Sequence, residues 1–96
     1  MRIALGSDHA GFNLKSCIEK SLHGSSVITG DFGAKGPENP FDYPDAAFDV
    51  GSRVARKEYD LGILVCGTGI GMSIAANKIP GIRAALAYDE ETGKLA

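Results

Sequence analysis

One segment constrains the fold of this chain more than any other. Residues 61–66 form an apolar run that leads directly into a turn with glycines at positions 67, 69 and 71. A short apolar run bounded by glycine is typical of a strand that is buried on both faces. Such strands occur in parallel sheets covered by helices, so the segment predicts an α/β fold.

The rest of the chain repeats the same alternation of strand and helix. Apolar patterning predicts strands over residues 2–6, 27–32, 61–66 and 82–88. Helices are expected over residues 12–22 and 72–78, from Pro44 onward, and from Glu90 onward with Asp89 as the cap. Four strand–helix pairs predict a three-layer α/β/α sandwich with a parallel, Rossmann-like sheet of four strands.

The first expected helix has one apolar face in the sequence pattern. Leu14, Ile18 and Leu22 recur every four positions, and Cys17 lies beside them. This spacing predicts that Cys17 is a core residue and that Lys15 faces water.

Composition excludes several function classes. Ninety-six residues suffice for one domain, expected over residues 1–96, and the net charge of -2 argues against a nucleic-acid partner. No apolar run approaches the roughly 20 residues that cross a bilayer, so we expect no membrane partner. The two cysteines and two histidines have neither disulfide-rich nor metal-binding spacing. We therefore expect a reduced, cytoplasmic protein without a metal site.

Two glycine-rich segments are similar to nucleotide-binding motifs but depart from them. Residues 6–11 have the spacing of a phosphate loop, yet Phe12 and Asn13 stand where lysine and serine or threonine belong. In the turn at residues 67–71, the third glycine comes one residue too early for a dinucleotide fingerprint. Neither segment therefore predicts ATP or NAD binding.

The expected sheet brings three polar segments to one edge. Ligands of parallel sheets bind at the carboxyl ends of the strands. Residues 7–9, the long loop over residues 33–43 and the turn over residues 66–71 all follow predicted strands. We therefore expect a binding site at this edge.

Cys66 is the strongest candidate for chemistry at this edge. Backbone N–H groups in the following turn, at a helix N-terminus, form a cradle for an anion. The same helix end favours a thiolate. A thiolate beside such a cradle can remove a proton from a carbon next to a carbonyl and stabilise the resulting enediolate. The other interpretation is that Cys66 is only a small buried residue, and the pattern leaves both open.

Other residues at the edge also have two interpretations. His9 can donate to a phosphate or move a proton, and Asp8 can hold a sugar hydroxyl or orient His9. Alternatively, Asp8 caps the following helix and His9 faces solvent. Tyr43, before Pro44, is either a packing residue or a substrate contact.

Four sequence blocks resemble the type B ribose-5-phosphate isomerases. The blocks are GSDHAG at residues 6–11, DYPD at 42–45, CGTGIGMSIAANK at 66–78 and GIRAA at 81–85. The wider family also holds galactose-6-phosphate isomerase subunits and allose-6-phosphate isomerases. The resemblance implies interconversion of ribose 5-phosphate and ribulose 5-phosphate without a metal or organic cofactor.

The resemblance also implies roles for the edge residues. Cys66 would be the base that moves the proton between C1 and C2, and Thr68 would assist the open sugar. The remaining substrate contacts implied by the resemblance are Asp8, His9, Tyr43, Gly67, Gly69, Ile70 and Gly71.

The family continues beyond residue 96 with a histidine-bearing segment, a fifth strand and an arginine-bearing helix. The resemblance assigns ring opening and phosphate binding largely to those parts, so we expect a C-terminally truncated isomerase domain. It also implies a homodimer or homotetramer. Two alternatives remain: a non-catalytic remnant that binds sugar phosphate or a full-length subunit, or a galactose-6-phosphate or allose-6-phosphate isomerase.

Overall fold

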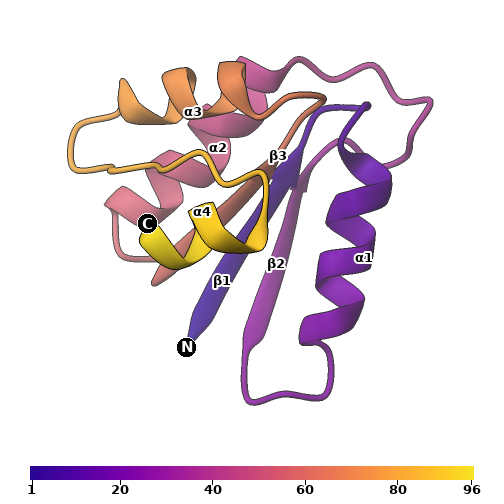
Figure 1. Ribbon diagram of the computed structural model, residues 1–96. Helices are drawn as coiled ribbons and strands as arrows, with labels where there is room; N and C mark the ends of the chain where they lie inside the picture. Colours follow the sequence, from indigo (N-terminus) through magenta and orange to yellow (C-terminus); the bar gives the residue numbers. More distant parts are fainter.

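The computed structural model describes residues 1–96. Its elements are β1 (Arg2–Ser7), α1 (Phe12–Leu22), β2 (Ile28–Gly33), α2 (Tyr43–Ala55), β3 (Leu61–Val65), α3 (Ile70–Asn77) and α4 (Glu90–Leu95). The strands form one parallel sheet in the order β2-β1-β3. Helix α1 lies on one side of this sheet, and α2 and α3 lie on the other (Figure 1). The predicted α/β sandwich with a parallel sheet is confirmed.

Small residues in the strands allow α2 to pack closely on the sheet. A Cβ at Gly6 would lie 2.6 Å from Val50, and a Cβ at Gly62 would lie 2.8 Å from the same side chain. Val50 is therefore buried against two adjacent strands, since Gly6 pairs with Leu64 in the neighbouring strand. None of the helices is both long and apolar enough to cross a membrane.

The prediction of a fourth strand over residues 82–88 is wrong. These residues belong to no strand, and the sheet has three members. The Asn77 carboxamide occupies both backbone groups of Ala84: its Nδ2 donates to the carbonyl at 2.8 Å, and its Oδ1 accepts from the N–H at 2.8 Å. At this one residue, a side chain thus takes both hydrogen bonds that a neighbouring strand would otherwise receive.

The predicted orientation of α1 is also wrong. Lys15 is only 2% exposed, whereas Cys17 is exposed and Leu14 is 57% exposed. Residues two apart on a helix point about 200° apart. Because Lys15 reaches inward to the end of β2, Cys17 must face away from the core. The hydrophobic period alone could not reveal that a lysine has buried acceptors.

Element boundaries near the predicted site differ by one or two residues. Strand β3 ends at Val65, so Cys66 lies just outside it, and α3 begins at Ile70 rather than Met72. Gly69 is the N-cap of α3 and has a φ of 81°, a backbone conformation that glycine adopts without strain. Helix α3 therefore begins two residues earlier than the apolar pattern predicted.

Asp89 caps α4, as predicted. Its carboxylate accepts the Thr92 backbone N–H at 2.7 Å, and this hydrogen bond, followed by one from the Thr92 hydroxyl, lowers the Asp89 pKa. A lowered pKa adds stability that is present at neutral pH and is lost as the pH falls through the folded-state value.

We expect Asp89→Ala to fray α4 at neutral pH. Asp89→Asn should retain the cap but remove its acid sensitivity. NMR Cα shifts of residues 90–95 against pH measure both effects, and equal helicity in the alanine variant would contradict the capping role.

Candidate active site

The first and third strands bring their carboxyl-end loops into contact. The Asp8 N–H donates to the Val65 carbonyl at 3.3 Å. A Cβ at Gly11 would overlap that same carbonyl, so only glycine allows the loop after β1 to lie so close. Ala10 is also the nearest neighbour of Gly67, at 4.0 Å from the position of a Cβ there. These contacts confirm that Asp8 and His9 share an edge with the segment over residues 66–71, which we call the glycine turn.

Cys66 occupies the start of the glycine turn. Its side chain is half-buried and packs against the small core cluster that contains Ala46, Ala47, Met72 and Ala76. Its Sγ accepts the Gly69 backbone N–H at 3.0 Å. An N–H directed at sulfur stabilises negative charge there. The thiol is therefore held at the turn rather than enclosed in the core.

The backbone amides of the glycine turn are divided between two uses. Cys66 Sγ takes the Gly69 N–H, and Thr68 Oγ1 accepts the Ile70 N–H at 3.2 Å. The N–H groups of Gly67, Thr68 and Gly71 donate no hydrogen bond within the chain. The anion cradle expected from the spacing thus has three available N–H groups rather than five, because the other two donate to side chains of the turn itself. Spacing alone does not reveal which amides are engaged in this way.

Asp8 and His9 have different surroundings. Asp8 is half-buried, and its Oδ1 accepts the Gly11 N–H at 2.8 Å, which closes a turn just before α1. The N-cap of α1 is Gly11 and no side chain caps the helix, so the interpretation of Asp8 as a helix cap is wrong. His9 is exposed, and its Nδ1 accepts the Phe41 backbone N–H at 3.5 Å. A neutral imidazole that accepts at Nδ1 carries its hydrogen on Nε2. His9 therefore presents a donor to solvent at the edge of the sheet.

Tyr43 reaches the site from the first residue of α2. A Cβ at Gly71 would lie 2.7 Å from two carbons of the Tyr43 ring, so the ring rests directly on the backbone of the glycine turn. The tyrosine is 41% exposed. It is thus both a packing residue and part of the accessible surface of the site. Phe41, which contacts His9 through its backbone, has no signal in the sequence that marks it as a site residue.

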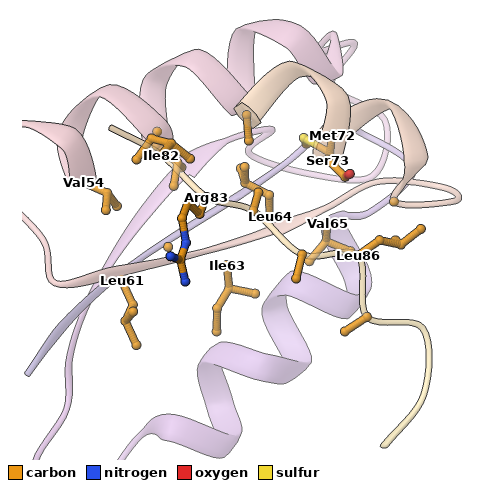
Figure 2. A pocket seen from close by; sticks show the side chains of 18 of the residues that line it. Val54, Leu61, Ile63, Leu64, Val65, Met72, Ser73, Ile82, Arg83 and Leu86 are labelled. Atoms are coloured by element: carbon orange, nitrogen blue, oxygen red, sulfur yellow. The ribbon is translucent and has the colours of Figure 1, made fainter. Parts of the chain in front are cut away.

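A cleft of about 1050 Å³ runs along β3 to the glycine turn. Leu61, Ile63 and Leu64 of β3 line it together with Arg83 and Leu86 from the segment after α3 (Figure 2). The lining continues to Gly69 in the glycine turn. Asp8, His9 and Tyr43 do not line this cleft, whereas Cys66 and Thr68 do. The candidate site therefore lies where the cleft reaches the edge of the sheet. No group of three or more His, Cys, Asp or Glu side chains is placed to hold a metal ion.

Comparisons with known proteins agree with the fold and with the sequence blocks. Residues 3–96 match the Ribose/Galactose Isomerase family. The structure of Clostridium thermocellum ribose-5-phosphate isomerase B is 46% identical, with a TM-score of 0.93 over 99% of this chain and 64% of that chain. The ribose-5-phosphate isomerase B of Mycoplasma genitalium with bound ribulose-5-phosphate is 42% identical, with a TM-score of 0.90 over 98% of this chain and 62% of that one.

A further relative differs in the sugar for which it is named. D-erythrulose-4-phosphate isomerase 2 of Mycolicibacterium smegmatis is 42% identical over 93% of this chain and 60% of its own length. The chain therefore spans about three-fifths of the length of these relatives.

Proposed function

The chain belongs to the ribose/galactose isomerase family, and we propose that it carries the proton-transfer site of a sugar-phosphate aldose–ketose isomerase. We propose ribose 5-phosphate and ribulose 5-phosphate as the substrate pair, since relatives with well over 40% identity are named for that reaction. The observation that carries the proposal is the position of Cys66 Sγ, half-buried and hydrogen-bonded to Gly69 beside three free backbone amides.

The proposed reaction begins at C2 of the open-chain aldose. The Cys66 thiolate removes the C2 proton, and the C–H electron pair becomes the C1–C2 double bond while negative charge moves to O1. The free N–H groups of Gly67, Thr68 and Gly71 stabilise this enediolate. The O2 proton passes to O1, and the thiol then returns its proton to C1, which leaves the carbonyl at C2. This sequence requires no metal or organic cofactor.

The other proposed contacts orient the sugar phosphate. Thr68 accepts an N–H through Oγ1, which leaves its hydroxyl hydrogen available to donate to the open sugar. His9 donates through Nε2, and the second carboxylate oxygen of Asp8 accepts a sugar hydroxyl. Tyr43 and the exposed Ile70 side chain form apolar walls at the mouth of the turn. These contacts place C2 near the sulfur while the backbone amides face O1.

A coupled assay with ribose 5-phosphate tests the proposal. Two proteins are compared: the 96-residue chain, and the same chain joined to the part of the Clostridium thermocellum relative that it does not span. We expect turnover in the joined protein. A joined protein that is folded but turns over no sugar phosphate would contradict an isomerase function. It would favour the alternative of a non-catalytic chain that only binds sugar phosphate or another subunit.

A four-carbon substrate is the second candidate. The observation in its favour is the 42% identity to a relative named for D-erythrulose 4-phosphate. The values of kcat/KM for ribose 5-phosphate, D-erythrulose 4-phosphate, galactose 6-phosphate and allose 6-phosphate, measured on the joined protein, separate the candidates. We expect the five-carbon sugar to have the highest value.

We also propose a homodimer, or a homotetramer of paired dimers, that works in the cytoplasm. An apolar groove of about 420 Å³ lies between α2 and α3, with Phe48 67% and Ile74 56% exposed along it. Contiguous exposed apolar side chains of this kind are typical of protein interfaces. Both cysteines are free thiols, as a reducing compartment requires. Sedimentation equilibrium of the 96-residue chain and of the joined protein measures the number of chains in each assembly.

A further inference from the structure

The side chain of Lys15 is buried, and all three polar partners of its ammonium group are oxygen atoms. Only 2% of it is exposed, although it belongs to a helix on the surface of the sheet. Its Nζ donates to the Phe32 carbonyl at 2.8 Å and the Ala34 carbonyl at 2.8 Å, and it pairs with the Asp31 carboxylate at 2.7 Å. An ammonium group has three hydrogens, so each has one acceptor. Lys15 is therefore a buried, fully hydrogen-bonded charge. It takes no part in the proposed proton transfer, so its role must be sought elsewhere.

All three acceptors lie at one place in the fold. Asp31 and Phe32 are near the end of β2, and Ala34 begins the loop over residues 34–42, which we call the site loop. The Ala34 N–H also donates to the Ser7 carbonyl at 2.9 Å. Lys15 therefore ties the start of the site loop to α1, the helix that directly follows Asp8 and His9. The Lys15 ammonium lies 5.1 Å from the centre of the Phe12 ring, in the first turn of that helix.

The far end of the site loop returns to His9. Phe41 donates its N–H to His9 Nδ1 at 3.5 Å and packs against the core cluster of Ala46, Ala47, Met72 and Ala76. Between Ala34 and Phe41 the loop has only two internal hydrogen bonds, at 3.4 and 3.2 Å, and both involve Asn39. The path of the loop is therefore set at its two ends, at Ala34 by Lys15 and the Ser7 carbonyl and at Phe41 by the core cluster.

We propose that Lys15 is a positioning residue that sets the orientation and tautomer of His9 through the site loop. By holding the Ala34 and Phe32 carbonyls, it fixes the path of the loop, and the Phe41 N–H then holds the imidazole with its hydrogen on Nε2. The donor that His9 presents to a sugar phosphate thus depends on a lysine that does not touch the substrate. The link to the substrate rests on the proposed function, whereas the state of His9 does not.

NMR of protein labelled with ¹⁵N-histidine tests the effect on His9 directly. In the unsubstituted chain at alkaline pH, we expect His9 to be mainly the Nε2–H tautomer. Lys15→Met removes the charge and all three donors while keeping a flexible stem of similar size. It should shift His9 to a mixture in which the Nδ1–H form rises severalfold. The matched control is Lys20→Met on the exposed surface of the same helix, and His23 is an internal reference.

The outcomes separate this proposal from the proposed function. An unchanged His9 tautomer in folded Lys15→Met overturns the role of Lys15, and so does a wild-type His9 that is mainly Nδ1–H. Lys15→Gln keeps one uncharged donor group, so it should fold even where methionine does not, and should give a smaller shift in the same direction.

On the joined protein, Lys15→Met should raise KM about tenfold with a smaller change in kcat. If His9 responds but no variant turns over sugar phosphate, the proposed function fails and the role of Lys15 stands.

Discussion

Cys66→Ala is expected to lower kcat for sugar-phosphate isomerisation about 10³-fold while the fold remains intact. The proposed chemistry needs one base that removes the proton from carbon, and general-base groups contribute about 10²- to 10⁴-fold. The sulfur is held at the turn by the Gly69 N–H, and alanine removes both the base and that acceptor. The measurement is the coupled assay on the joined protein, together with exchange of solvent deuterium into the substrate. Loss of both turnover and exchange identifies Cys66 as the group that moves the proton.

The chain supplies its own control for this substitution. Cys17 is the only other cysteine, and it is exposed on the outer face of α1. Cys17→Ala should leave kcat and KM unchanged. Cys66→Ala removes a half-buried sulfur that packs on the core cluster and accepts the Gly69 N–H, so it should cost about 1 kcal/mol of unfolding free energy. Turnover by Cys66→Ala within tenfold of the parent protein would exclude it as the base.

Gly33→Ala should have the largest effect on stability among single-methyl additions. Gly33 ends β2 with a φ of 80°, and a Cβ there would overlap the Ser7 carbonyl oxygen and lie 2.9 Å from the Ser7 nitrogen. The neighbouring atoms are backbone of the central strand and cannot rotate away. We expect the free energy of unfolding to fall by about 3 kcal/mol, from backbone strain and overpacking together. A denaturant titration followed by circular dichroism measures this change.

Gly24 allows the two causes to be separated. Its φ is 86°, close to that of Gly33, yet nothing lies within 4 Å of a Cβ at this position. Gly24→Ala therefore reports the strain of a positive φ alone, about 1 kcal/mol. The difference between the two variants measures the close approach of β1 and β2. Equal destabilisation would mean that the approach has no energetic consequence.

The paired strands were predictable because their signals are local. Apolar runs bounded by glycine located β1, β2 and β3 to within one residue at each end. The sequence also predicted Asp89 as the N-cap of α4. The region over residues 82–88 is also an apolar run, but it makes no strand-to-strand hydrogen bonds. Within it, Ala84 gives both of its backbone hydrogen bonds to the Asn77 carboxamide, seven residues away, rather than to a strand. An apolar run indicates a preference for extended backbone and does not identify the group that receives its hydrogen bonds.

Sequence alone predicted the α/β class, the edge of the sheet where three polar segments meet, and the position of Cys66 at the start of a glycine turn. These follow from the period of apolar residues and from the rule that parallel strands end at one edge, both of which are properties of short segments. Tertiary structure was needed for the burial of Lys15, the exposure of Cys17, the division of the turn's amides and the contact between Phe41 and His9. The burial of Lys15 and the contact between Phe41 and His9 depend on polar atoms that meet across 17 to 32 residues of chain, and the exposure of Cys17 depends on how α1 is rotated. The division of the amides depends on the conformation of the turn itself, where the partners are two or three residues apart. Only the packed fold determines those distances, because a buried polar group is stable only where its partners already lie.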